Sequence, residues 1–159
     1  MNPFQIRLAR QTDLTGIFLV EDDSFSKPYP HDLIAKLLRD WPNSFLVAEH
    51  QPGKIIGYCV AAEEGKSAHL ISIGVIQEYR RRGIGTALIR RLLANLSSGV
   101  KELRLEVKEN NREAITFYEA IGFKQVDYAQ NYYEDGSAAI QMHLTIHEAN
   151  GGASRSGAK

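Results

Sequence analysis

The sequence predicts an α/β fold with a mixed, mostly antiparallel sheet of about six or seven strands and about four helices. Three observations lead to this prediction. Short stretches alternate apolar and polar residues, as half-buried strands do, while longer stretches repeat apolar residues every three or four positions, as amphipathic helices do. The two kinds of stretch alternate along the chain, which excludes a solenoid and a pure β-sandwich. A chain of 159 residues fits one hydrophobic core, so we expect a single domain over residues 1–147.

The amino-terminal part reads as a strand, a helix, a loop and a second helix. Residues 4–8 alternate in polarity and predict the strand, after which Thr12 is expected to cap the first helix. Pro28 and Pro30 both restrict the residue before them, so the segment SFSKPYPHDL predicts a loop. Pro30 fits the start of the second helix, because a proline there loses no helical hydrogen bond.

Three consecutive strands are expected next. Residues 44–49 and 54–62 predict a hairpin, because the turn-forming letters QPG separate them. Residues 68–75 predict the third strand, and we expect the three to pair antiparallel. From Gly85 onward leucines recur at helical spacing until the stretch ends at Gly99, which predicts a long amphipathic helix.

The remaining chain predicts three more strands and one helix. Residues 103–107 alternate as a strand, and Asn110 with Glu113 forms a capping-box-like start for a helix that Gly122 ends. The last two predicted strands cover residues 123–128 and 138–145. The tail, residues 148–159, has few apolar side chains and many glycines and serines, so we expect it to be disordered.

Composition limits the partners and the compartment. Nineteen basic and nineteen acidic side chains cancel, so no global field attracts the chain to nucleic acid. Every apolar run is shorter than the roughly 20 residues of a membrane span, so no membrane helix is expected. The opening MNPFQIRLARQTD lacks the features of a secretory signal, which favours the cytoplasm. Cys59 is the only cysteine, so it forms no intrachain disulfide and is expected to be a buried, inert thiol.

The segment RRRGIG predicts a phosphate-binding loop. It lies between a predicted strand and a predicted helix, where backbone N–H groups and the helix amino terminus can hold an anion. Gly83 and Gly85 let the backbone approach closely, and arginine binds two phosphate oxygens at once. No lysine follows Gly85 and Leu88 stands at the third glycine position of a dinucleotide fingerprint, so both nucleotide motifs are disfavoured. A solvated basic turn remains the ordinary alternative.

This segment resembles the coenzyme A loop of the GNAT N-acetyltransferase superfamily, whose pattern Gln/Arg-x-x-Gly-x-Gly/Ala is filled here by Arg80, Gly83 and Gly85. The preceding strand, LRLEV and NNREAITFYEAIGF occur in family order, so the resemblance spans residues 4–145. The stretches LEVKENNREAITFYEAIGF and NYYEDG are similar to the ribosomal-protein-alanine acetyltransferases and their archaeal amino-terminal acetyltransferase relatives. The resemblance implies the GNAT fold and acetyl-coenzyme A as cosubstrate, without a metal.

The resemblance also implies which residues contact the cofactor. They comprise the end of the strand before the loop, the loop itself and two residues further on, namely Ile73, Gly74, Val75, Arg80, Arg81, Arg82, Gly83, Ile84, Gly85, Thr86, Asn111 and Tyr118. The Val75 N–H is the implied donor to the oxyanion. Asn111 fits an ordinary helix start equally well.

Acetyl transfer to an amine needs a neutral amine, a site for the oxyanion and a proton for the leaving thiolate. Strand alternation puts Glu106 on the opposite side from Leu105 and Val107, and the resemblance makes Glu106 the general base. The resemblance makes Tyr118 the general acid, and an unperturbed phenol can protonate a thiolate. A solvent-facing glutamate and a core-packed tyrosine are the ordinary alternatives.

The acceptor is predicted to be a protein or peptide amino terminus, with a ribosomal protein as one candidate acceptor. An α-amine titrates at about 7.7–8.0 and a lysine amine at about 10.4, so one modest base suffices for an amino terminus. SFSKPYP and NYYEDG are the expected acceptor-binding segments, with the side chains Phe25, Tyr29, Tyr132 and Tyr133. The acidic residues that could attract a cationic peptide end are Glu21, Asp22, Asp23 and Asp135. A solvated acidic turn, with the loop aromatics packing at a sheet edge, is an equal alternative.

Other functions remain open at this point. The same fold could acetylate a lysine or a small amine, or bind coenzyme A without turnover as a regulatory domain. Nucleic-acid binding through RRRG is disfavoured by the neutral net charge. His143 and His147 lie near an extended strand end, where their spacing does not converge on a metal. His31, His50 and His69 are expected at surface or strand positions, and no oligomeric state follows from the sequence.

Overall fold

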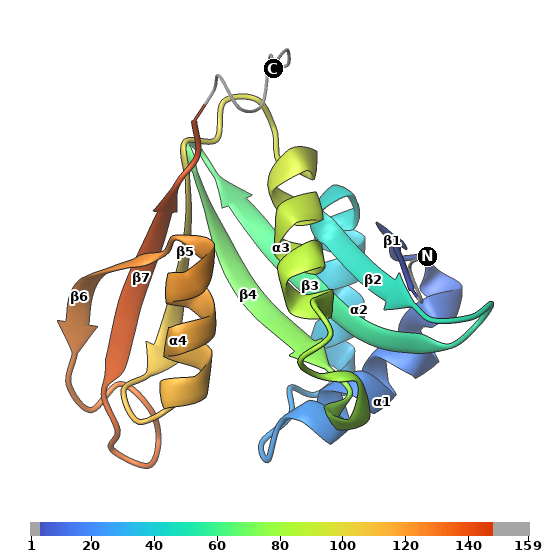
Figure 1. Cartoon of the computed structure of the whole chain (residues 1–159), viewed down its shortest axis with the longest axis horizontal. Coiled ribbons are helices and arrows are strands. Elements are labelled where there is room, and N and C mark those ends of the chain that lie inside the picture. The colour runs from blue at the N-terminus through green and yellow to red at the C-terminus, as the bar shows by residue number, and fades with distance from the viewer. Residues whose placement is uncertain (1–3, 148–159) are drawn as a thin grey trace. The chain divides into compact units, whose positions relative to one another are not determined.

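The computed structural model describes residues 4–147, which form seven strands and four α-helices (Figure 1). The strands are β1 (Gln5–Leu8), β2 (Phe45–Glu49), β3 (Ile55–Glu64), β4 (Ser67–Val75), β5 (Glu102–Lys108), β6 (Lys124–Ala129) and β7 (Ala139–Thr145). The helices are α1 (Leu14–Ser24), α2 (His31–Asp40), α3 (Ile84–Asn95) and α4 (Arg112–Ile121). Short 3-10 helices cover Gln11–Asp13, Pro42–Ser44 and Gln77–Tyr79. The predicted tail, 148–159, lies outside the described residues.

The strands follow one another across the sheet in the order β1-β2-β3-β4-β5-β7-β6. Strands β1/β2, β2/β3, β5/β7 and β6/β7 pair antiparallel, and β4/β5 is a parallel pair. The mixed, mostly antiparallel α/β fold predicted from the sequence is therefore confirmed. Among the described helices, none has the length and apolar character to cross a membrane.

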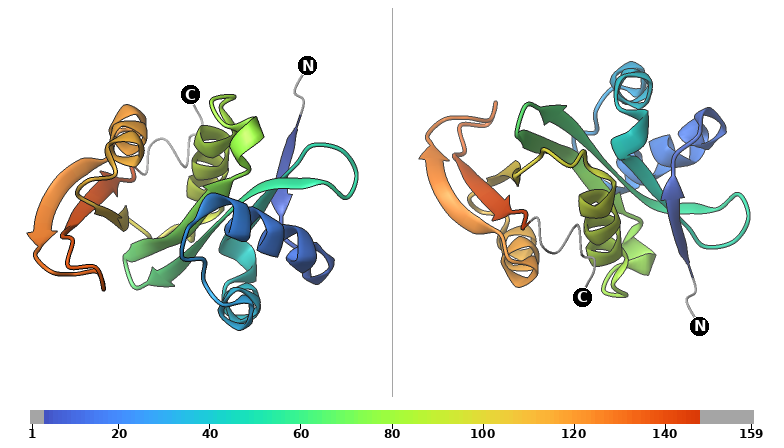
Figure 2. Two further views of the ribbon diagram at one scale, coloured as in Figure 1. Left: turned by 90° about the horizontal axis from the view of Figure 1, so that it is seen from below. Right: turned by 90° about the horizontal axis from the view of Figure 1, so that it is seen from above.

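The fold divides into two compact units, one from residues 1–62 and 70–96 and the other from 63–69 and 97–159. In the first unit, α1 and α2 cover one face of strands β2 to β4 and α3 covers the other (Figures 1 and 2). The main core cluster lies on the α1 and α2 side and consists of Ile17, Val20, Ile34, Leu37, Leu38, Phe45, Val47, Ile55, Tyr58 and Val60. Burial of each large apolar side chain stabilises the fold by about 1.5–3 kcal/mol.

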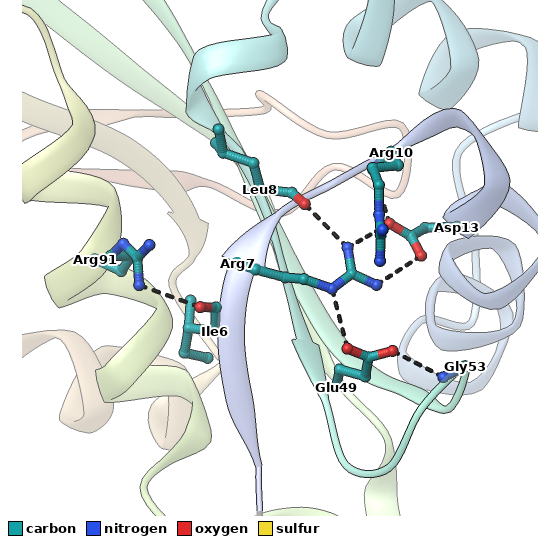
Figure 3. Close-up of polar contacts among 8 residues, drawn as sticks. All are labelled: Ile6, Arg7, Leu8, Arg10, Asp13, Glu49, Gly53 and Arg91. Carbon is teal, nitrogen blue, oxygen red and sulfur yellow. Dashed lines mark hydrogen bonds and ion pairs between the residues drawn. The ribbon is translucent and has the colours of Figure 1, made fainter.

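Strand β1 is tied to its surroundings by arginines. Figure 3 shows the Arg7 guanidinium between Asp13, at 2.8 and 2.9 Å, and Glu49, at 3.0 Å. Arg91 of α3 donates to the Ile6 carbonyl at 3.1 Å. Edge strands expose unpaired backbone groups, so these contacts fix β1 from both its paired side and helix α3.

In the second unit, α4 lies in front of β5 and β7 in Figure 1. Its buried core includes Leu103, Leu105, Val107, Ile115, Tyr118, Phe123, Ile140 and Met142. Buried and half-buried residues alternate along β5, as its sequence predicts. Strand β6 pairs with β7 alone and exposes every residue.

The start of the first helix differs from the prediction. Thr12 lies within the 3-10 turn Gln11–Asp13 and does not cap α1. The Asp13 side chain instead accepts the Arg10 N–H at 2.7 Å. The same carboxyl is also bound by Arg7. Helix α2 does begin directly after a proline, as predicted from the segment SFSKPYPHDL.

Two further helix boundaries also differ. Helix α3 ends at Asn95, before the predicted Gly99, because Leu96 is already extended. Helix α4 is capped by Asn111 and not by the residue before it, since Asn111 Oδ1 accepts the Ala114 N–H at 3.1 Å. Both differences concern caps, where side chains compete for the same backbone groups.

Candidate active site

The end of strand β4 is packed closely against helix α1. A Cβ added to Gly74 would lie 3.0 Å from Ser24 Oγ and 3.4 Å from a ring carbon of Phe25. The next carbonyl, that of Val75, accepts from Arg80 Nε at 2.9 Å and lies 3.4 Å from Ser24 Oγ. A side chain at Gly74 would thus crowd Ser24 and Phe25, and the first arginine of the loop fastens that loop to β4.

The loop before α3 has the backbone of an anion site. Arg81 has φ 64° and Gly83, the N-cap of α3, has φ 81°, so both adopt the left-handed region. The N-cap supplies no side-chain acceptor to the first turn. The Ile84, Gly85 and Thr86 amides therefore lie at a helix amino terminus whose dipole favours an anion. The predicted position of RRRGIG between a strand and a helix is confirmed; the phosphate it would hold stays a prediction.

The three arginines of this loop have different surroundings. Arg80 bonds the Val75 carbonyl, whereas Arg82 lies over the Tyr79 ring at 5.0 Å from its centroid. A pocket of about 720 Å³ between β1 and α3 is lined by Arg82, Gly83 and Arg91, among others. Arg80 is thus bound to the backbone at the end of β4, whereas Arg82 lies against an aromatic ring.

The structure corrects one prediction about the acidic residues of α1, namely that Glu21 could attract a cationic peptide end. Glu21 is buried, at 2% exposed, so it cannot attract a peptide end from solvent. Asp23 accepts the Gln77 N–H at 2.8 Å, and Asp22 lies 3.5 Å from His31 Nε2. Each of the three therefore has a partner within the protein, and burial of Glu21 is the physical reason for the correction.

Phe25 and Tyr29, the predicted acceptor-binding residues of the first unit, are both 38% exposed. Phe25 is the C-cap of α1, and its N–H donates to the Glu21 carbonyl at 3.2 Å. The Tyr29 hydroxyl donates to the Ile71 carbonyl at 3.4 Å. Their rings are available to a ligand while their backbone is fixed.

In the second unit, Glu106 is the centre of a polar cluster. Its Oε1 lies 2.6 Å from His69 Nε2, and its Oε2 accepts from Gln141 Nε2 at 3.4 Å. Arg104 Nη1 lies 3.7 Å from the same Oε2. The Glu106 side chain is only 18% exposed, so the solvent-facing alternative is wrong. A half-buried carboxyl beside an imidazole can accept and pass on a proton.

His69 is a candidate functional residue that the sequence interpretation missed. The β4/β5 register places His69 opposite Arg104. Glu106 follows Arg104 by two residues and so lies on the same face of β5. A signal was present, because alternation puts His69 on the same strand face as Ile73 and Val75, the predicted acetyl-binding segment. The partner strand that brings Glu106 to it could not be read from the sequence.

For Tyr118 and Asn111 the structure is compatible with both the functional and the ordinary structural interpretation. Tyr118 is 9% exposed, and its ring lies 5.5 Å from that of Phe123 and 5.2 Å from that of Phe117. Asn111 uses its Oδ1 to cap α4, which leaves its amide nitrogen for other contacts. Core packing is therefore observed for Tyr118, and it is compatible with a phenol that acts as an acid.

The NYYEDG segment forms a tight loop. The rings of Tyr132 and Tyr133 meet edge to face at 5.0 Å, and Lys108 Nζ lies 5.2 Å from the Tyr133 centroid. Asp135 accepts from the Ser137 hydroxyl at 2.6 Å, from the Ser137 N–H at 2.9 Å and from Lys108 at 3.1 Å. These bonds, those from Ser137 above all, hold the pKa of Asp135 well below its usual value. Asp135 thus stabilises its own loop.

The remaining reactive side chains have structural surroundings. Cys59 is fully buried, as predicted, and burial raises the pKa of its thiol. His31 stacks on Phe18 with ring centroids 4.0 Å apart, and His143 Nδ1 lies 3.1 Å from Glu102. Over residues 4–147, no three His, Cys, Asp or Glu side chains gather as a metal site would require.

Comparisons with known proteins identify the family of the chain. The family described as "Acetyltransferase (GNAT) family" matches residues 13–123. An N-alpha-acetyltransferase of Sulfurisphaera tokodaii is 33% identical over 153 residues, covering 87% of this chain and 91% of the relative. The ribosomal protein bS18-alanine N-acetyltransferase of Escherichia coli is 32% identical over 139 residues, covering 85% and 93%. The crystal structure of Ard1 from Thermoplasma volcanium superposes with a TM-score of 0.86 at 30% identity, covering 92% of this chain and 99% of that one. The chain belongs to the GNAT acetyltransferase family.

Proposed function

We propose that this acetyltransferase transfers the acetyl group of acetyl-coenzyme A to the α-amine of a protein or peptide amino terminus, in a direct ternary complex. The observation that carries the proposal is the 2.6 Å contact between His69 and Glu106, which gives a half-buried carboxyl a proton-accepting neighbour. The N-alpha-acetyltransferase activity named for relatives that cover most of the chain supports the acceptor class.

The donor would be held by the first unit. Arg80, Arg81, Arg82 and the amides of Gly83, Ile84, Gly85 and Thr86 would bind the pyrophosphate at the start of α3. Backbone groups of Ile73, Gly74 and Val75 would hold the acetyl-pantetheine arm, with the Val75 N–H toward the oxyanion. Asn111 and Tyr118 of the second unit are the other proposed cofactor contacts. Membership of the family and the left-handed loop backbone support this assignment.

The proposed chemistry forms one C–N bond and breaks one C–S bond. The lone pair of the neutral α-amine attacks the acetyl carbonyl carbon, and Glu106, assisted by His69, accepts the proton that this nitrogen loses and later releases it to solvent. The tetrahedral intermediate collapses and expels the coenzyme A thiolate. Tyr118 gives its phenolic proton to that sulfur and is later reprotonated from solvent. No covalent acyl-enzyme forms, and no metal takes part.

An amino terminus is the acceptor that this machinery fits best. An α-amine titrates near 7.7–8.0, so a useful fraction is neutral at pH 7 and one carboxyl base is sufficient, whereas a lysine amine near 10.4 needs a stronger base. The exposed rings of Phe25, Tyr29 and Tyr132, with Tyr133, are the proposed contacts to the first residues of the peptide. A ribosomal protein is one possible acceptor class, by analogy with the named Escherichia coli relative.

The bounds of the domain and the compartment of the protein remain predictions. The family match over residues 13–123 runs through both compact units, which supports a single acetyltransferase domain over 1–147. The cytoplasm stays the predicted compartment.

The test is acetyl-coenzyme A turnover with a library of peptides that vary in their first residues. One control set carries a blocked amino terminus and an internal lysine, and another contains polyamines. We expect turnover only with free amino termini. Activity confined to blocked lysine peptides or to small amines would reassign the acceptor, while coenzyme A binding without any turnover would favour a regulatory domain.

A further inference from the structure

Glu21 is a buried acid that bonds both strand β3 and the segment 25–30, which we call the acceptor loop. Its Oε2 accepts the Tyr29 N–H at 2.8 Å, and its Oε1 accepts from the Tyr58 hydroxyl. Its backbone carbonyl accepts the Phe25 N–H at 3.2 Å. A buried carboxyl without such partners would cost several kcal/mol. One residue of α1 therefore bonds both predicted acceptor-binding residues.

Tyr58 extends this contact to strand β4. Its side chain is 1% exposed, and its hydroxyl oxygen lies 2.8 Å from Ser72 Oγ. A phenol has one proton, which goes to Glu21, so the Ser72 hydroxyl donates to the phenol oxygen. Burial, followed by the neighbouring Glu21, raises the pKa of Tyr58, so it stays a donor at any physiological pH. The acceptor loop is thereby joined through Glu21 and Tyr58 to the strand that carries Ile73 and Val75.

The middle of the acceptor loop is held at a single backbone donor between two prolines. Pro28 and Pro30 carry no backbone N–H. The Tyr29 N–H donates to Glu21 at 2.8 Å, and the Tyr29 hydroxyl makes a longer bond of 3.4 Å to the Ile71 carbonyl. The Glu21 carboxyl therefore binds the backbone at the middle of this loop.

We propose that Glu21 is a positioning residue that sets the affinity for the acceptor peptide without touching it. This inference rests on the proposed function, because it assumes that Phe25 and Tyr29 contact the acceptor. A fixed loop binds its ligand without first losing conformational entropy. Loss of the Glu21 bonds should therefore raise the KM for the peptide and leave the KM for acetyl-coenzyme A unchanged.

Two substitutions at one position separate hydrogen bonding from volume. Glu21→Met keeps the length of the side chain but accepts no bond from Tyr29, and we expect the peptide KM to rise about tenfold. In Glu21→Gln the amide oxygen can accept the Tyr29 N–H while the amide nitrogen donates to Tyr58, whose proton then turns to Ser72. We expect Glu21→Gln to retain a near wild-type peptide KM. Asp40→Asn, which removes an exposed carboxylate of α2 that pairs with Lys36, is the matched control and should change neither KM.

A second readout does not depend on turnover. Because Pro28 and Pro30 have no amide, the exchange rate of the Tyr29 amide, measured by NMR, reports the middle of the acceptor loop. We expect exchange at least tenfold faster in Glu21→Met and near wild type in Glu21→Gln. Tyr58→Phe, which keeps the Glu21 contact to Tyr29 but removes its link to Ser72, should give an intermediate rate and serves as the test if Glu21→Met does not fold.

The outcomes distinguish this inference from the proposed function. If the wild type acetylates no peptide, the proposed function fails, and the Tyr29 exchange rates still show whether Glu21 positions the loop. Unchanged exchange in Glu21→Met and Tyr58→Phe would overturn the inference. A parallel rise of both KM values would overturn it as well, since it would indicate general damage. Equal effects of the Met and Gln variants would assign the role to charge and not to the hydrogen bond to Tyr29, which also contradicts it.

Discussion

Single residues decide whether a proton can be moved at the Glu106 cluster. Glu106 has a hydrogen-bonding neighbour on each side, His69 from β4 and Gln141 from β7. We expect Glu106→Gln to lower kcat by about 100-fold or more, the usual contribution of a general base, because an amide accepts no proton. Coenzyme A protection against heat should be unchanged. His69→Gln should lower kcat less and shift the pH–rate profile. Full activity of Glu106→Gln would exclude it as the base.

Tyr118 tests the other end of the reaction. Its ring packs against Phe123 and Phe117, so Tyr118→Phe keeps the packing and removes only the hydroxyl. We expect kcat to fall much more than the affinity for coenzyme A, because the thiolate loses its proton donor. The matched control is Tyr128→Phe, which removes an exposed phenol that bonds Glu109. Equal turnover in Tyr118→Phe and the wild type would leave Tyr118 with a packing role alone.

At the scale of elements, β1 depends on ionised carboxyl groups. Burial acts against ionisation of Asp13, but its bonds from Arg7 and Arg10 lower its pKa below the usual value. The hydrogen bond from Arg7, and then that from Gly53, lower the pKa of Glu49. Because both folded-state pKa values lie below the unfolded values of about 4, the stabilisation is complete above that pH and is lost as pH falls through the folded-state values.

Removal of the arginine should therefore change the acid dependence of stability. We expect Arg7→Met to unfold at lower denaturant concentration at pH 7 and to lose less further stability than the wild type between pH 5 and about 3. The measurement is the free energy of unfolding in urea at a series of pH values. Lys36→Met removes an exposed ion pair with Asp40 and should leave the wild-type pH dependence intact. Parallel curves for Arg7→Met and the wild type would contradict this account.

The sequence predicted elements well and contacts between elements poorly. Periodicity is local, so the seven strands and four helices could be read from it, including the alternation that places Glu106 away from Leu105. The cap of α4 was misplaced because Asn110 and Asn111 are neighbouring candidates for the same backbone groups, and the end of α3 was misplaced because nothing in the local pattern marks Leu96 as extended. His69 and Glu21 were misread for another reason. Their roles come from partners distant in sequence, Glu106 and Tyr58, and strand order and register bring these pairs together.

For the whole molecule, the family match and the two units suggest a division of labour. Arg80 to Thr86, which would hold the pyrophosphate of the donor, belong to one unit, whereas Glu106 and Tyr118, the proposed base and acid, belong to the other. The matched segment 13–123 includes both groups of residues. A cofactor that binds the native state alone stabilises it by mass action. Coenzyme A should therefore raise the melting temperature of the whole chain.

Two glycine variants can test whether coenzyme A stabilises the protein by binding at the loop before α3. At a concentration about 100 times its Kd, a ligand stabilises by about 2.7 kcal/mol, which is roughly 5–10 °C for a chain of this size. Gly83→Ala and Gly65→Ala both place a Cβ at a positive φ, with no atom within 4 Å, so each should cost a similar amount of intrinsic stability, about 1 kcal/mol. Only Gly83 belongs to the proposed phosphate-binding loop. We therefore expect the coenzyme A shift to persist in Gly65→Ala and to fall by at least half in Gly83→Ala, measured by differential scanning fluorimetry. An equal shift in the two variants would place the phosphates away from the start of α3.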